Sequence, residues 1–204
     1  MAKINSNYDK LSAGYLFPEI ARRTKNFLDS NSGVEVMRLG IGDTPEPIVP
    51  AVIEGLHRGV QNLASADTYS GYGASEGINP LREGIAALYR EQNAEVNADE
   101  VFVSDGAKSD SANIQSIFSE ENVVAVQDPA YPVYVDSNVI AGRAGIAGDS
   151  GYDGLVYMPC SEENDFFPSV PDSKVDLIYI CSPNNPTGAV ATREQLKTFV
   201  DYAR

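Results

Sequence analysis

The chain has 204 residues, of which 43% are hydrophobic and 22% are charged, a composition typical of a globular protein with one or two domains. Its formal net charge of −14 argues against the basic surface that binds nucleic-acid backbones. No apolar run reaches membrane-spanning length, and the N-terminus lacks the pattern of a signal peptide. We therefore expect a cytoplasmic protein with neither a nucleic-acid partner nor a membrane partner.

Few residues of the kinds that bind metals or form disulfides are present. His57 is the only histidine, and it lies beside Arg58 in a segment that we expect to be solvated. Cys160 and Cys181 are too far apart in sequence to form a Cys-x-x-Cys motif. The sequence therefore predicts no metal site, no disulfide framework and no histidine-based catalytic triad.

The first half of the chain is predicted to be irregular at its start and helical further on. Residues 1–45 are expected to form an arm with short elements, and apolar residues at helical spacing predict a helix within 46–64. A Gly-rich loop covers 68–77. A second helix is predicted to start with Asn79 as its cap and Pro80 in its first turn.

From residue 100 onward, apolar runs alternate with amphipathic segments. The expected elements are strands over 100–105, 122–128 and 176–181, helices over 106–119 and 131–142, and a last helix after Thr192. Alternation of this kind predicts an α/β domain with a mostly parallel sheet.

Apolar spacing predicts a buried face on two of these helices. The helix over 106–119 is expected to bury Ile114, Ile117 and Phe118. The last helix is expected to open with a capping box of Thr192 and Gln195. Its buried stripe would comprise Leu196, Phe199, Val200 and Ala203. The tract 161–167, "SEENDFF", is expected to be an exposed loop.

Each expected strand is followed by a turn that is rich in Gly, Pro or polar residues. The turns are "SDGAK" at 104–108, "QDPAYP" at 127–132 and "SPNNPTG" at 182–188. Open α/β sheets bind ligands at the carboxyl ends of their strands, so three such turns together predict a ligand site. Each turn by itself is equally compatible with an ordinary strand-to-helix connection.

In combination, the three turns favour a particular kind of ligand. The amides of Gly106, Ala107 and Lys108 would hold a phosphate at a helix N-terminus, and Tyr131 would offer a flat aromatic face. An asparagine of "SPNNPTG", held by two prolines, would present its amide to a polar group on a ring. Pyridoxal 5'-phosphate meets these requirements better than a dinucleotide does, because no Gly-x-Gly-x-x-Gly opens a helix.

Several longer segments resemble a known enzyme family. They are "NYDKLSAGYLFPEIARR", "LGIGDTPEP", "GYGASEG", "VFVSDGAKSD", "DPAYPVYVDSNVIAG", "GYDGLVYMPCSEENDFFP" and "ICSPNNPTGAV". Together they resemble the class I/II aminotransferases of fold type I, and among these the subfamily that uses LL-diaminopimelate. The resemblance covers essentially the whole chain. "SPNNPTG" is typical of the superfamily, whereas "AGYLFPEIARR", "SDGAK" and "YPVYVDSNV" are specific to the subfamily.

The resemblance implies a fold, a cofactor and a set of cofactor-binding residues. The fold would be the three-layer α/β/α large domain, incomplete here and covering 46–204, preceded by an N-terminal arm and part of the small domain over 1–45. The cofactor would be pyridoxal 5'-phosphate. Its phosphate would be bound by Ala107, Lys108 and, across a homodimer with a shared active site, Tyr72. Tyr131 would stack on its ring and Asn185 would hydrogen-bond its phenolic oxygen.

The resemblance also implies a reaction and substrate contacts. An amino acid and a 2-oxo acid would exchange an amino group, with LL-2,6-diaminopimelate and 2-oxoglutarate as the pair used in lysine biosynthesis. Tyr15 and Gly42 would contact the substrate, together with Lys108, Tyr131 and Asn185.

Some features of the family's pattern are absent from this chain. In the family, the Schiff-base lysine, the aspartate at the pyridine nitrogen and the arginine for the substrate carboxylate all follow "NPTG", so no catalytic residue is assigned here. The position where the resemblance implies an acid for the distal amine holds Ser75, next to Glu76. The chain is therefore expected to be an inactive N-terminal fragment. An aminotransferase for another amino acid, or a non-catalytic ligand-binding or dimerisation module, remains an alternative.

Overall fold

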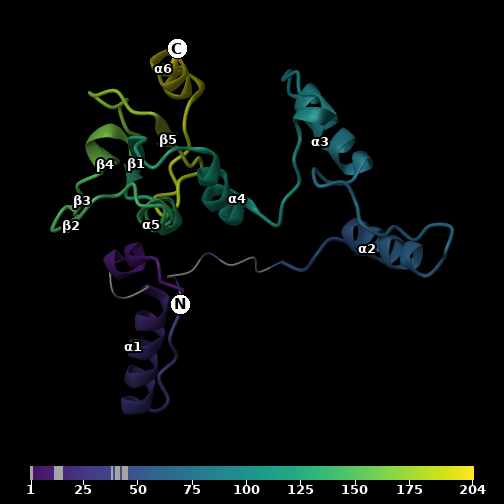
Figure 1. Cartoon of the computed structure of the whole chain (residues 1–204). Coiled ribbons are helices and arrows are strands. Elements are labelled where there is room, and N and C mark those ends of the chain that lie inside the picture. The colour runs from purple at the N-terminus through teal and green to yellow at the C-terminus, as the bar shows by residue number, and fades with distance from the viewer. Residues whose placement is uncertain (1, 12–15, 38, 40–41, 43–45) are drawn as a thin grey trace. The chain divides into compact units, whose positions relative to one another are not determined.

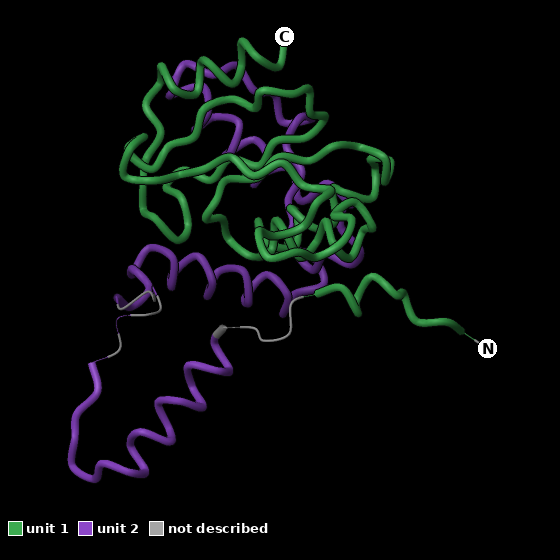
Figure 2. The backbone as a smooth tube through the Cα atoms, turned by 90° about the vertical axis from the view of Figure 1, so that its left-hand side faces the viewer, with its two compact units in different colours: residues 1–15, 105–204 green, residues 16–104 purple. Residues whose placement is uncertain are grey.

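The structure is a computed structural model, and it describes residues 2–11, 16–37, 39, 42 and 46–204. The chain divides into two compact units, one of residues 1–15 with 105–204 and one of residues 16–104 (Figure 2). The expected division into an arm over 1–45 and a large domain over 46–204 stays a prediction.

The unit of residues 1–15 and 105–204 is built on a parallel sheet of three strands (Figure 1). Its strands are β1 (Val124–Asp128), β4 (Leu155–Pro159) and β5 (Leu177–Tyr179), in the order β4-β1-β5. Both neighbours run parallel to β1. The expected α/β architecture with a parallel sheet is thus confirmed.

Helices cover both faces of this sheet, because alternate residues of β1 point to opposite sides. Val124 and Val126 pack with Val139 of α5 (Pro132–Ile140), whereas Ala125 packs with Phe199 of α6 (Arg193–Ala203). The three layers are therefore helix, sheet and helix. The remaining elements of this unit are η1 (Ser6–Lys10), α4 (Ala107–Asn113), η3 (Ile114–Ile117), η4 (Glu162–Asn164) and the hairpin of β2 (Ala147–Gly148) with β3 (Gly151–Tyr152).

The regular elements that the structure describes in the unit of residues 16–104 are all helices or 3-10 turns. It contains α1 (Leu16–Ser30), α2 (Pro50–Leu63), α3 (Asn79–Glu91) and the 3-10 turn η2 (Ala98–Glu100). The Arg82 guanidinium of α3 donates to the Val101 carbonyl at 2.9 Å and so holds the end of this unit against α3. Helix α2 confirms the prediction for 46–64, and none of its residues is buried.

The strand predicted over 100–105 is absent. Glu100 ends the 3-10 turn η2, residues 101–105 have no regular secondary structure, and Phe102 is 73% exposed. A strand is stabilised by a ladder of hydrogen bonds to a neighbouring strand. The Val103 N–H donates to the Glu76 carbonyl at 2.8 Å, but residues 101–105 form no ladder with a described strand, so the apolar run does not become a strand.

Several helix details also differ from the predictions. Ile78, not Asn79, is the N-cap of α3, although Pro80 does lie in the first turn. The helix predicted over 106–119 changes from α to 3-10 geometry at residue 114. Because a 3-10 helix has three residues per turn, this change rotates the expected face, leaving Ile114 and Ile117 exposed and Gln115 buried.

The last helix has the predicted start but a narrower buried face. Thr192 and Gln195 form the expected capping box, with reciprocal hydrogen bonds of 2.8 and 3.1 Å. Phe199 is buried, whereas Leu196 and Val200 remain exposed. The tract 161–167 is not wholly an exposed loop, because Phe167 is buried and meets Phe199 edge to face at 5.8 Å.

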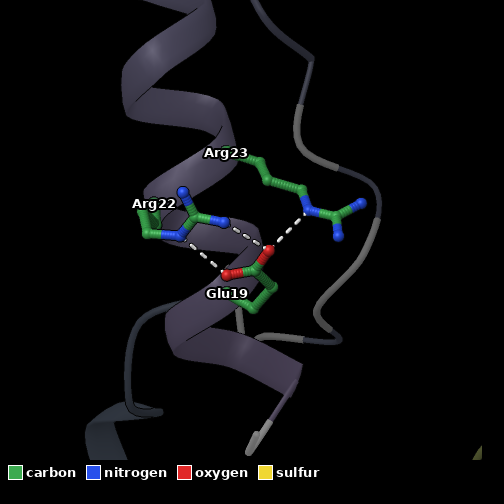
Figure 3. Close-up of polar contacts among 3 residues, drawn as sticks. All are labelled: Glu19, Arg22 and Arg23. Carbon is green, nitrogen blue, oxygen red and sulfur yellow. Dashed lines mark hydrogen bonds and ion pairs between the residues drawn. The ribbon is translucent and has the colours of Figure 1, made fainter.

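Helix α1 lies in the segment that was expected to be irregular, and a cluster of charges stabilises it (Figure 3). Glu19 accepts from Arg22, one turn along, at 2.7 and 2.8 Å and from Arg23 at 2.7 Å. These hydrogen bonds from Arg22 and then Arg23 lower the pKa of Glu19 from 4.5 to about 2. The spacings i,i+3 and i,i+4 are those at which side chains meet on a helix.

We predict that Phe199→Ala strongly destabilises the chain. Phe199 is 6% exposed and packs on Phe167 and Met158, so its removal should lower the free energy of unfolding in urea by about 3–5 kcal/mol. Phe102→Ala, the same change at a 73% exposed side chain, should cost less than about 0.5 kcal/mol. Equal losses for the two variants would contradict the core described here.

We also predict that the Glu19 carboxyl titrates near pH 2 and that the two arginines cause this. Since the folded pKa lies below the unfolded one, the stabilisation of α1 is complete above pH 4.5 and is lost as the pH falls toward 2. A carboxyl NMR titration of the Arg22→Ala/Arg23→Ala variant should give a midpoint closer to 4.5. High salt should shift the wild-type midpoint the same way, because the pair is exposed. An unchanged midpoint in the double variant would refute the assignment.

Candidate functional site

The candidate site lies at the carboxyl edge of the parallel sheet, where β1 and β5 end side by side. Two side-chain amides join the segments that leave these strands. Gln127 accepts from the Cys181 N–H at 2.6 Å, and Asn184 donates to the Pro129 carbonyl at 3.2 Å. Two of the three predicted turns, 127–132 and 182–188, are therefore adjacent in the structure.

Tyr131 stands at the N-terminus of α5 and is partly buried. Its ring meets Tyr134 edge to face at 5.9 Å, and Tyr134 in turn stacks on Tyr179 of β5 at 5.2 Å. Burial and then Cys181 raise the pKa of Tyr134 to about 12, so its hydroxyl stays protonated at neutral pH. The row of three tyrosines fixes the ring of Tyr131 beside the end of the sheet.

Asn185 occupies the tip of a small loop and is exposed. The loop is closed at its base, where the Asn184 N–H donates to the Ala189 carbonyl at 2.8 Å and the Gly188 N–H donates to the Asn184 carbonyl at 2.7 Å. The Asn185 side chain makes no hydrogen bond with any residue that the structure describes. Its amide is therefore available to a ligand.

Ala107 and Lys108 lie in the first turn of α4, and both are exposed. Gly106, the N-cap, has φ +133°, a conformation that L side chains rarely adopt, and the space around its α-carbon is open. Burial raises the pKa of Asp136 on α5, and the positive charge of Lys108 opposes that rise.

A buried polar network positions this helix, and sequence reasoning did not find it. Gln115 donates to the Ser137 hydroxyl at 2.7 Å and to the Tyr179 hydroxyl at 3.0 Å. Arg143 donates to the Gln115 side chain at 2.9 Å and to the Phe118 carbonyl at 2.6 Å, which caps the C-terminus of η3. "SDGAK" does not follow a strand, contrary to the prediction. Gln115, in the 3-10 turn η3 after α4, joins this helical segment to α5 and β5. Only its buried position in three dimensions distinguishes Gln115 from a surface glutamine.

The other predicted site residues belong to the unit of residues 16–104 or are not described. Tyr72 is fully exposed in the Gly-rich loop. Gly42 is exposed, and nothing lies within 4 Å of where a Cβ would be. Ser75 is exposed and Glu76 is partly buried. Tyr15 lies outside the described residues, and the site described above comprises only residues of the 105–204 segment.

The residues of the three turns have the chemistry that pyridoxal 5'-phosphate requires. A positive-φ glycine with open space around it and a lysine two residues further on suit a phosphate. A fixed tyrosine ring suits a pyridine ring, and the Asn185 amide suits the phenolic oxygen. Among the described residues, no group of three His, Cys, Asp or Glu side chains could hold a metal ion. In the same part of the chain, no helix has the length and apolarity to cross a membrane.

Comparison with known proteins gives the same family. Residues 34–204 match the family described as "Aminotransferase class I and II". Among solved structures, the chain is 47% identical to an L,L-diaminopimelate aminotransferase from Chlamydomonas reinhardtii, with a TM-score of 0.88, and covers 100% of its own length and 50% of that chain.

Two further structures extend the likeness. BacF from Bacillus subtilis is 26% identical with a TM-score of 0.78, over 100% of this chain and 50% of that one. An aspartate aminotransferase from Thermotoga maritima, 24% identical over 98% of this chain and 51% of that one, shares the fold with a TM-score of 0.74. The chain spans about half the length of these relatives. It belongs to the class I and II aminotransferase family, whose members depend on pyridoxal 5'-phosphate.

Proposed function

We propose that this chain is the cofactor-binding N-terminal half of an aminotransferase that exchanges an amino group between LL-2,6-diaminopimelate and 2-oxoglutarate. The observation that carries the proposal is 47% identity, over the whole chain, to a protein described as an L,L-diaminopimelate aminotransferase. The other reported relatives are far less similar, at 26% and 24%. Lysine biosynthesis in the cytoplasm is the proposed context.

Each cofactor-binding residue has a role that its position permits. The Ala107 amide and the Lys108 ammonium bind the phosphate at the start of α4. Tyr131 covers one face of the pyridine ring, and Asn185 donates to the phenolic oxygen from its exposed loop tip. When bound, the cofactor supplies the electron sink that stabilises the carbanion formed at the substrate α-carbon.

The substrate and the second subunit involve further residues of this chain. Gly42, which has open space where a side chain would be, lets the backbone approach the α-carboxylate of the substrate. Tyr15 also contacts the substrate, as do Lys108, Tyr131 and Asn185. The fully exposed Tyr72 reaches the phosphate of the partner subunit in a homodimer with a shared active site.

Proton transfer requires groups that this chain does not supply in the family's positions. Lys108 is assigned to the phosphate, and Lys174 and Lys197 lie in other segments, with Lys197 paired to Asp201. The chain by itself therefore binds and orients the ligand but has no lysine placed to move a proton at the α-carbon.

A second candidate, an aminotransferase for another amino acid, is favoured by one observation. Ser75 stands where the resemblance implies an acid for the distal amine of diaminopimelate, and Glu76 beside it is only partly exposed. A neutral hydroxyl attracts an ammonium far less than a carboxylate does. A non-catalytic ligand-binding or dimerisation module is the remaining alternative, and the 204-residue chain alone would satisfy it.

We predict that residues 1–204 bind pyridoxamine 5'-phosphate but do not catalyse transamination. This probe keeps the phosphate, the ring and the phenolic oxygen and needs no lysine. By isothermal titration calorimetry, Lys108→Ala should weaken binding by about tenfold or more, and Asn185→Ala by about fivefold, the difference between losing a charged and a neutral hydrogen bond.

The controls for this measurement are Lys174→Ala and Asn122→Ala, which remove the same side-chain types elsewhere and should leave the affinity unchanged. Equal losses in the controls would contradict the assigned site. Measurable turnover with diaminopimelate and 2-oxoglutarate would show that the chain is catalytically complete.

In the full-length enzyme that carries this chain, we predict that Glu76 binds the distal amine of LL-diaminopimelate. The Glu76→Gln variant should raise KM for LL-diaminopimelate by about tenfold, the usual scale for one charge-assisted hydrogen bond. KM for L-2-aminopimelate, which lacks that amine, should not change, and Glu83→Gln is the matched control. If wild type uses both donors with the same kcat/KM, the diaminopimelate assignment fails and the second candidate stands.

A further inference from the structure

Asn184, the residue before the proposed cofactor ligand Asn185, is almost completely buried. It is 3% exposed, although it lies in a loop whose next two residues are exposed. Its side-chain amide donates to the Pro129 carbonyl at 3.2 Å and to the Thr187 hydroxyl at 3.1 Å. One side chain therefore contacts both its own loop and the segment that leads to Tyr131.

The orientation of this amide is determined by its neighbour. A carbonyl oxygen only accepts hydrogen bonds, so the Nδ2 of Asn184 must face Pro129. Its Oδ1 is left buried without a partner among the described residues. A buried side chain with half of its hydrogen-bonding capacity unused contributes little to stability. Its bond between the two segments is the contribution that an apolar side chain could not make.

A second buried amide joins the same two segments. Gln127 is 3% exposed, and its Oε1 accepts from the Cys181 N–H at 2.6 Å, directly where β5 ends. The stretch from Cys181 to Asn184 is thus attached at both ends to the strand and turn that precede Tyr131. Asn185 follows the second attachment immediately.

We propose that Asn184 is a positioning residue that sets the place of Asn185 relative to Tyr131. The loop closed by the Gly188 N–H and the Ala189 carbonyl carries Asn185 at its tip, and Asn184 anchors the base of that loop to Pro129. Through this contact, the amide that meets the phenolic oxygen and the ring that covers the pyridine keep one geometry. The identity of the ligand rests on the proposed function, whereas the hydrogen bonds of Asn184 do not depend on it.

The first test is a double-mutant cycle on the 204-residue chain, with pyridoxamine 5'-phosphate as the probe and calorimetry as the readout. Asn184→Ala should weaken binding by about fivefold, as Asn185→Ala does, because misplacing Asn185 loses the same neutral hydrogen bond to the ligand. In the Asn185→Ala background, Asn184→Ala should have almost no further effect, whereas with Lys108→Ala its effect should add. An undiminished loss in the Asn185→Ala background would overturn the proposal.

Asn138→Ala is the matched control. Asn138 is also buried, its amide donates to one carbonyl, that of Tyr134 at 2.7 Å, and its Oδ1 likewise lacks a partner. Its bond stays within α5, so its loss should lower stability without a selective effect on the probe. If Asn138→Ala reproduces the Asn184→Ala pattern in the cycle, Asn184 acts only through stability.

If Asn184→Ala fails to fold, Thr187→Val is the second variant, because it removes one acceptor of the Asn184 amide at nearly constant volume. It should weaken binding of the probe less than Asn184→Ala does. Its effect should also disappear in the Asn185→Ala background.

The second test needs no ligand. In hydrogen exchange of the free chain, Asn184→Ala should speed the exchange of the Gly188 N–H by about tenfold, while the Cys181 N–H, held by Gln127, keeps its rate. An unchanged rate at Gly188 would overturn the proposal. If the rate rises but wild type does not bind the probe, the anchoring role stands and the proposed cofactor function fails.

Discussion

The central strand β1 is the element on which the rest of the described site depends. Val124, Ala125 and Val126 are completely buried, and β1 is paired on both sides, with β4 and β5. Its alternate side chains anchor α5 on one face of the sheet and α6 on the other. Since β1 cannot shift without exposing both cores, the turn that follows it, with Tyr131, has a fixed place.

Beyond the last ladder hydrogen bonds, buried amides continue the connection between the strands. Gln127 and Asn184 join the exits of β1 and β5, and Gln115 joins α4–η3 to α5 and β5. A buried amide is costly unless it is hydrogen-bonded, and its directional bonds favour one arrangement over others of similar packing. The loop that carries Asn185 is exposed at its tip, whereas its base is held by hydrogen bonds of the buried Asn184.

The unit of residues 16–104 shows how far a local pattern determines structure. Helix α2 has apolar residues at helical spacing, as predicted, and Leu56 and Val60 are 58% and 67% exposed. The apolar run around Phe102 forms no strand, because it pairs with no described strand. Periodicity determines which conformation a segment favours, whereas the surface that it packs against depends on residues distant in the sequence.

By itself, the sequence determined the α/β class, the parallel sheet, the capping box at Thr192 and the family, because these depend on local chemistry and on long matching segments. Only the tertiary structure decided that Gln115 is buried where Ile114 and Ile117 are exposed, that β4 pairs with β1, and that Phe167 meets Phe199. It also decided that Asn184 lies between the two proposed ligand loops. The physical reason is the same in each case, since strand pairing, side-chain burial and long-range hydrogen bonds join residues that are far apart in the chain.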